Sequence, residues 1–160
     1  MKNHLKILAQ NPDHVMALNY LGWLRFQQRD MTSSFSLFQQ ALKLEPNYPE
    51  ATLSMGQWYH TQRNLELAKK YYRLAISLDE CLAETYYRLA QTLVPPGTTH
   101  TEPVVLQEAR ELCKKAQSIF ACEQALGIPS LFTCQGLESY YESLAQLTLE
   151  PSAALSPIHN

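Results

Sequence analysis

The chain has 160 residues, 46% of them hydrophobic and 18% charged, which is enough apolar material for one compact unit or one short repeat array. Its formal net charge is −2 and it contains no run of lysine or arginine, so we exclude electrostatic capture of nucleic acid, which needs a clustered basic surface. No stretch approaches the ~18 apolar residues of a membrane-spanning helix and the N-terminus lacks a signal-peptide core, so we expect a soluble chain.

A short phrase recurs along the chain at an interval of 34 residues. It reads LAQNP up to Pro12, LKLEP up to Pro46 and ISLDE up to Glu80. An internal period of this length is the signature of a repeat architecture. The sequence therefore predicts successive copies of one structural unit.

Residues 1–11 align with the second half of a unit whose first half is missing. Two interpretations fit this alignment: an N-terminal capping helix, or the end of an array that continues upstream. A repeat array needs covered ends because each unit buries its apolar face only against its neighbours.

The first unit, residues 13–46, and the second unit, residues 47–80, each predict two helices joined by a short polar turn. Apolar residues recur at spacings of three and four on both sides of the turns that end at Asp30 and Asn64. These two side chains are expected N-caps, because a short side-chain oxygen accepts hydrogen bonds from free backbone amides. Pro49 is expected to open the first helix of the second unit.

Gly22 and Gly56 lie inside predicted helices, where glycine costs ~1 kcal/mol relative to alanine. We expect a close approach between the two helices of the same unit to offset this cost. Residues of matching size recur on the second helices: Ala41, Ala75 and Ala116 are small, whereas Phe38 and Tyr72 are large and are expected to fill the space between successive units.

The third unit, residues 81–122, departs from the pattern. Its first helix begins at Ala83 and is expected to end near Val94, because the following PPG sequence cannot continue a helix. Residues 95–103 form an inserted loop, and Pro103 opens a longer second helix. The insertion fits either a tolerated surface loop or a rim beside a binding groove.

Residues 129–149 predict a final amphipathic helix that no longer carries the repeat signature. We expect it to cap the C-terminal end of the array, and docking of a partner is the alternative role. Residues 150–160 are expected to be a flexible tail. The apolar stripe of this helix consists of Leu137, Tyr140, Tyr141, Leu144 and Leu147.

The recurring spacing and residue sizes resemble the tetratricopeptide repeat (TPR) family over roughly residues 1–122. The resemblance implies an all-α fold, a right-handed superhelical array of antiparallel helix pairs. It also implies a non-catalytic scaffold or adaptor that binds a peptide or helix of a partner protein in a concave groove.

In tetratricopeptide proteins, positions 2, 5, 9 and 12 of the first helix of each unit line the groove. Trp23 is the most informative of these residues, because binding interfaces favour tryptophan as an anchor. It is either an exposed anchor for a partner or a core residue covered by residues 1–11. We expect the groove to be aromatic in the first unit and mildly acidic toward the third. The matching residues are Met16, Asn19, Trp23, Phe26, Glu50, Leu53, Gln57, His60, Glu84, Tyr87, Gln91 and Val94.

One tetratricopeptide subclass holds the C-terminal carboxylates of Hsp70 and Hsp90 with cations and an amide. The corresponding positions here carry Asn19, Trp23, Ser54, Tyr87 and Gln91, so the cations are missing. We therefore expect partners other than this carboxylate.

Two alternatives to the adaptor stay open. The NPD opening at residues 11–13 and the interrupted third unit are similar to tetratricopeptide assembly factors or chaperone-like proteins of the bacterial cytochrome c maturation type. The other alternative is a structural subunit that associates with itself through the final helix or the N-terminal edge.

The reactive side chains form no recognisable chemical site. The cysteines include no CxxC pair and no histidine at ligand spacing, so we expect no metal site, and unpaired thiols favour a cytoplasmic location. The histidines are scattered and no glycine-rich phosphate loop exists. We therefore predict no enzymatic activity and no cofactor.

Overall fold

The computed structural model describes residues 6–7, 10–127 and 135–147. The expectations for the N-terminal segment are mostly outside the described residues, and those for the tail are entirely outside them. The described helices confirm the all-α prediction: α2 (Val15–Gln27), α3 (Met31–Leu44), α4 (Pro49–Thr61), α5 (Leu65–Leu78), α6 (Ala83–Leu93), α7 (Pro103–Ala125) and α8 (Gln135–Gln146).

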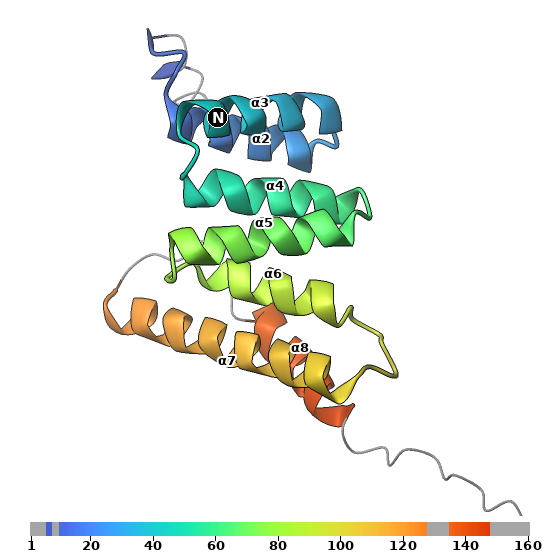
Figure 1. Cartoon of the computed structure of the whole chain (residues 1–160). Helices are drawn as coiled ribbons and strands as arrows, with labels where there is room; N and C mark the ends of the chain where they lie inside the picture. The colour runs from blue at the N-terminus through green and yellow to red at the C-terminus, as the bar shows by residue number, and fades with distance from the viewer. Residues whose placement is uncertain (1–5, 8–9, 128–134, 148–160) are drawn as a thin grey trace, which may run out of the picture.

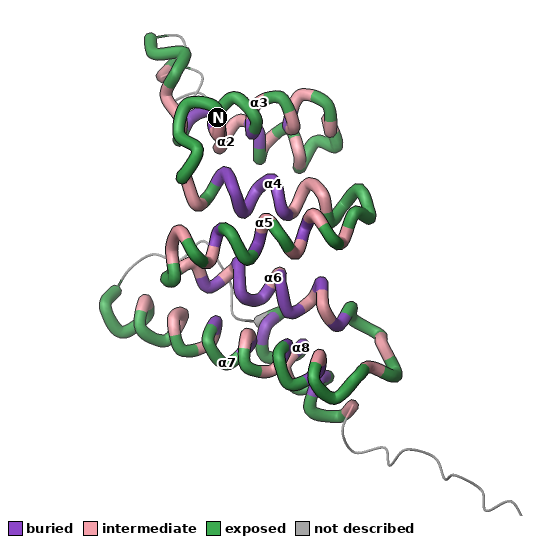
Figure 2. Tube along the Cα trace, in the orientation of Figure 1, coloured by how far each residue is buried: buried purple, intermediate pink, exposed green. Residues whose placement is uncertain are grey.

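The first six of these helices form three antiparallel pairs, α2 with α3, α4 with α5, and α6 with α7, stacked in chain order (Figure 1). The most extensive contacts lie within each pair. The first helices of successive pairs, α2, α4 and α6, also contact one another. Buried residues concentrate where pairs meet, and exposed residues lie along the outer sides of α3 and α7 (Figure 2). The structure is therefore an array of helix pairs, as predicted.

The helix ends follow the local sequence. Asp30 Oδ1 accepts a hydrogen bond from the amide of Ser33 at 3.1 Å, and Asn64 Oδ1 accepts one from the amide of Leu67 at 3.2 Å, which confirms both expected N-caps. Pro49 occupies the first turn of α4, where its missing amide leaves no hydrogen bond unmade.

The two turns before these caps place an arginine in the left-handed backbone region. Arg29 has φ 64° and Arg63 has φ 62°, at matching positions of the first two units. The residue after each arginine hydrogen-bonds back to the end of the preceding helix. The amide of Asp30 donates to Arg25 O, and the amide of Asn64 donates to Tyr59 O. Glycine is the usual residue at this position, so an arginine there does not indicate the left-handed conformation.

An aromatic ring lies directly on each helical glycine. A Cβ added to Gly22 would lie 2.6 Å from Cε1 of Phe38, and one added to Gly56 would lie 2.6 Å from Cδ1 of Tyr72. Both rings are almost completely buried. The expected close approach within each unit is confirmed, with a side-chain ring as the contacting group. Tyr72 also packs on Leu89 of the next unit.

The final helix, α8, covers the open end of the third pair. Leu137, Tyr140 and Leu144 of the predicted stripe are buried against α6 and α7. The Tyr140 hydroxyl lies within hydrogen-bonding distance of the carbonyl oxygens of Ala90 and Val94, at the end of α6. α8 lies within the predicted range 129–149, of which residues 129–134, 148 and 149 are outside the described residues, and capping of the array stays a prediction.

Gly56→Ala is expected to lower the free energy of unfolding by about 1–3 kcal/mol, because the added methyl group overlaps a ring that cannot move away. Chemical denaturation measures the change. The third unit has alanine and cysteine at the corresponding positions, Ala90 and Cys113. The Gly56→Ala penalty should therefore largely disappear in a Tyr72→Cys background, and an equal penalty there would contradict the ring contact.

Arg63→Gly is expected to raise the free energy of unfolding by about 1 kcal/mol, because glycine adopts a positive φ without the steric cost of a Cβ. Arg63→Ala is the matched control, since it removes the same side chain but keeps the Cβ. Equal denaturation midpoints for the two variants would show that the backbone strain is not the cause.

Candidate functional site

The candidate groove is the face that α2, α4 and α6 form together. At its first unit, Met16 and Trp23 are exposed over 59% and 40% of their surface. The Tyr20 ring stacks on the Trp23 ring with centroids 6.2 Å apart, and Phe26 is half-buried. These values agree with the exposed interpretation of Trp23, and the alternative, cover by residues 1–11, falls mostly outside the described residues.

The residues at position 5 do not line the groove. Leu53 is only 7% exposed and packs with Tyr72 and with Leu89 of the next unit, and Tyr87 is only 9% exposed. Asn19 is half-buried, and its Oδ1 is buried without a hydrogen-bond partner in the described structure. Leu53 and Tyr87 therefore belong to the junctions between elements of the stack.

In the third unit, α8 lies against the expected groove residues. The Tyr87 hydroxyl donates to Gly136 O at 3.0 Å, and its ring packs edge-on against Tyr140 at a centroid distance of 5.7 Å. Gln91 Nε2 donates to the Tyr87 hydroxyl at 2.8 Å, so its amide group is already engaged. Val94 is buried. The accessible part of the groove is therefore shorter than the sequence pattern indicates.

A polar network occupies the centre of the groove. Gln57 Nε2 donates to Glu84 Oε1 at 2.8 Å, and the same oxygen forms an ion pair with Arg88 at 3.0 Å. The expectation of a mildly acidic groove is therefore wrong at Glu84, whose charge is neutralised by a cation on the same helix. Arg88 was not among the predicted groove residues, although its spacing of four from Glu84 is typical of a helical ion pair.

His60 and Glu50 complete the predicted set. Both are exposed, at opposite ends of α4. His60 is exposed as a residue, but its ring is partly desolvated. This desolvation, followed by the charges of Arg88 and Arg63, lowers the pKa of His60 below its ordinary value and so favours the neutral ring. Glu50 bears a charge in the first turn of α4, where it favours the helix N-terminus.

The described residues contain no group of three or more His, Cys, Asp or Glu side chains that could hold a metal ion. In the same part of the chain, every helix is too short or too polar to cross a membrane.

The described cysteines differ sharply in their surroundings. Cys81 and Cys122 are exposed, whereas Cys113 is completely buried in the third unit, and burial raises the pKa of its thiol to about 12. Cys113 is therefore a packing residue of the third unit.

Thiol labelling of a Cys134→Ser variant tests this difference. At neutral pH we expect Cys81 and Cys122 to react readily in the native protein and Cys113 to react only after denaturant is added, because a buried neutral thiol is a poor nucleophile. Mass spectrometry of the labelled peptides identifies each site. Labelling of Cys113 at the same rate as the exposed thiols would show that the third unit opens in solution.

Comparisons with known proteins agree with this architecture. Residues 50–80 match the family model of the tetratricopeptide repeat. The first tetratricopeptide domain of Spaghetti (RPAP3), solved with an HSP90 peptide, is 13% identical and superposes with a TM-score of 0.63, covering 82% of this chain and 90% of that domain. The translocator chaperone SycD of Yersinia enterocolitica is 18% identical, with a TM-score of 0.65 and coverage of 85% and 86%.

A curated relative matches a shorter stretch. The protein adenylyltransferase Fic of Drosophila grimshawi is 39% identical over 57 residues, which are 35% of this chain but only 12% of that enzyme. The chain thus carries a tetratricopeptide repeat at residues 50–80, and its described helices have the fold of a tetratricopeptide-repeat array.

Proposed function

We propose that this chain is a non-catalytic protein-interaction module, a scaffold or adaptor that holds a peptide or helix of a partner protein along the groove. The exposure of Met16 and Trp23 on α2 carries the proposal. α2 is apolar on nearly all sides, with Arg25 as its single charged residue. Helices of this kind are normally buried, so α2 offers apolar area that a partner can cover.

The polar centre supplies the second kind of contact. Gln57, Glu84 and Arg88 hold one another in place, so a partner meets fixed hydrogen-bonding groups beside the apolar surface. Groups ordered before binding lose little conformational entropy when the complex forms. Because the groove is short and buries limited area, we expect a dissociation constant of about 1 μM.

Two of the solved structures provide support at the level of the fold. Spaghetti was solved with the HSP90 peptide SRMEEVD, and SycD with a peptide of the translocator YopD. The partner of this chain is expected to differ from the Hsp70 and Hsp90 carboxylate, because Trp23 and Ser54 stand at clamp positions. We also expect neither nucleic acid nor an inserted membrane as a partner, and the free thiols favour the cytoplasm.

Catalysis has no support from the site. His60 has no hydrogen-bonded carboxylate among the described residues, and Glu50 lies at the other end of α4. A general base needs an orienting partner and a reacting group within reach. The match to Fic covers too little of that enzyme to bring its adenylyltransferase activity to this chain.

A Met16→Ala/Trp23→Ala variant tests the proposed groove. We expect it to bind the partner at least tenfold more weakly than the intact chain, because a central tryptophan in an interface typically contributes more than 1 kcal/mol. Affinity capture from the source lysate identifies a protein retained by the intact chain, and calorimetry with that purified protein measures the loss.

Val104→Ala is the matched control, because Val104 is an exposed apolar residue at the start of α7, outside the groove. Circular dichroism verifies that all three proteins are folded. Equal affinity of the partner for the intact chain and the double variant would exclude the groove as the binding site.

Self-association is a second candidate, favoured by the same apolar surface of α2. A second copy that covers Met16 and Trp23 would give a dimer in solution. Light scattering over a range of concentrations distinguishes it from a monomeric adaptor, and the same double variant should then be monomeric.

A further inference from the structure

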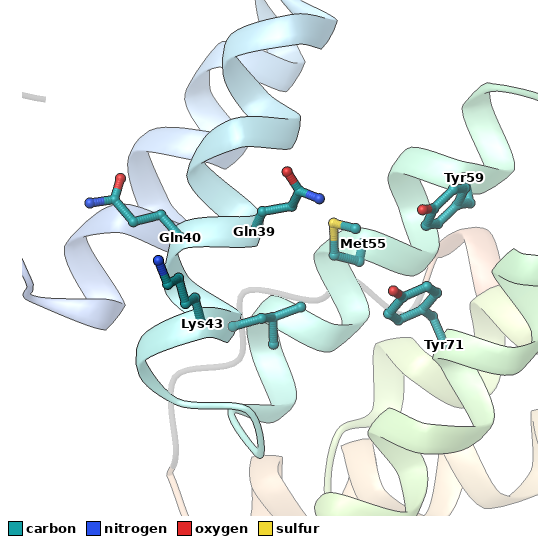
Figure 3. A pocket seen from close by; sticks show the side chains of 7 residues that line it. Gln39, Gln40, Lys43, Met55, Tyr59 and Tyr71 are labelled. Atoms are coloured by element: carbon teal, nitrogen blue, oxygen red, sulfur yellow. The ribbon is translucent and has the colours of Figure 1, made fainter.

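A hollow of 710 Å³ lies between α3 and α5, on the side of α4 opposite to the groove (Figure 3). α4 forms its base through Met55 and Tyr59, each two residues from Gln57. Two residues correspond to a turn of about 200° around a helix. The hollow is therefore a surface separate from the proposed groove.

The next junction of the array, between α5 and α7, is closed at the corresponding place. Arg73 of α5 and Glu108 of α7 form an ion pair of 2.9 Å across it. Beneath this ion pair, Ile76, Leu93 and Leu112 pack against the core. The open hollow is therefore not a general property of the repeat geometry.

Sequence differences explain why the first junction stays open. Gln39 of the first unit stands where the second unit has Arg73, and Leu67 of the second unit stands where the third unit has Glu108. No ion pair can therefore form across the first junction at this place. Tyr59 and Tyr71 replace the leucines of the closed junction, and their hydroxyl groups bring polar atoms to the rim.

The wall of the hollow is a fixed aromatic cluster. The Tyr59 and Tyr71 rings stack with centroids 5.3 Å apart and an interplanar angle of 16°. Phe35 packs on Trp58 at 4.6 Å, and Trp58 packs edge-on against Tyr59 at 5.2 Å. Trp58 Nε1 also donates to the carbonyl of Met31 at 3.0 Å, which fixes the cluster to the first turn of α3. This wall is therefore ordered before any ligand binds.

The opposite wall is mixed and carries one basic residue. Gln39, Gln40, Leu42 and Lys43 of α3 line it, and the Gln39 side chain points toward Met55 and the tyrosines whereas the Gln40 side chain points away from them (Figure 3). Among the described residues, Lys43 has no carboxylate within ion-pair distance, and the side chains that line the hollow include no acid. Met55 is only 2% exposed and provides an apolar base. The hollow thus combines an apolar base, amide and hydroxyl groups, and one unpaired positive charge.

We propose that this hollow is a second docking site, which binds a short segment of a partner protein with an apolar side chain next to a glutamate or aspartate. The apolar side chain covers Met55 between the tyrosine and glutamine walls, and the carboxylate pairs with Lys43. The Gln39 amide is placed to hydrogen-bond the backbone of the segment. The volume is in the usual range for ligand pockets, about 300–1,000 Å³, and suits a few residues.

The methionine methyl groups allow a direct test, since Met55 lies in the hollow and Met16 lies in the groove. The protein is labelled with ¹³C-methyl methionine and titrated with short acetylated and amidated peptides in which Leu, Phe or Met adjoins a glutamate. We expect the Met55 methyl signal to shift and saturate while the Met16 signal stays in place. Versions with a free C-terminal carboxylate show whether a terminal carboxylate substitutes for the side chain.

Charge changes on either partner should weaken binding. We expect glutamate→glutamine peptides, and separately Lys43→Glu protein, to bind about tenfold more weakly, because each change removes the pairing of opposite charges. Lys70→Glu is the matched control, since it reverses a charge on α5 outside the lining of the hollow. Thermal melting verifies that both variants are folded.

Three results would overturn the proposal. The first is the absence of a Met55 shift with every peptide, and the second is equal affinity for Lys43→Glu and the parent protein. The third is a Met55 shift that follows protein concentration and not peptide concentration, which would show that a second copy covers the hollow.

Discussion

The contact between a helical glycine and a buried aromatic ring sets the geometry of the first two units. Without a Cβ on Gly22 or Gly56, the ring of Phe38 or Tyr72 lies directly on the backbone of the first helix. This contact brings the two helices of a pair together, and the small residues beside it, such as Ala41 and Ala75, are fully buried. Each pair then presents a defined surface to the next pair, as repeat arrays require.

The two faces of the array follow from this stacking. The first helices of successive pairs contact one another, and the Gln57–Glu84 hydrogen bond connects α4 to α6 on that side. On the other side, the second helices are separated by a first helix, so side-chain size and charge decide whether a junction is closed. Arg73 and Glu108 close one junction, whereas the residues around Lys43 leave the other open.

Much of the fold could be predicted because its determinants are local in sequence. The caps at Asp30 and Asn64 and the end of α6 before Pro95 depend on the chemistry of adjacent residues. The site was harder to predict because exposure depends on the neighbouring element. Leu53 and Tyr87 occupy groove positions of the repeat, yet the next helix of the stack covers each of them. The hollow depends on residues from three helices, which no single repeat pattern contains.

The third unit shows how the volume at the glycine–ring contact is redistributed. Ala90 replaces the glycine and Cys113 replaces the ring, and Tyr87 and Tyr140 pack in the same buried cluster. A methyl group is added on one helix, a ring is lost from the other, and α8 contributes an aromatic side chain of its own. The units of this array are therefore not interchangeable helix by helix. A chimera that pairs α6 with α5 would place the Ala90 methyl group where the Tyr72 ring requires a bare backbone. Recombination between units therefore has to exchange complete helix pairs. The third pair has to be exchanged together with α8.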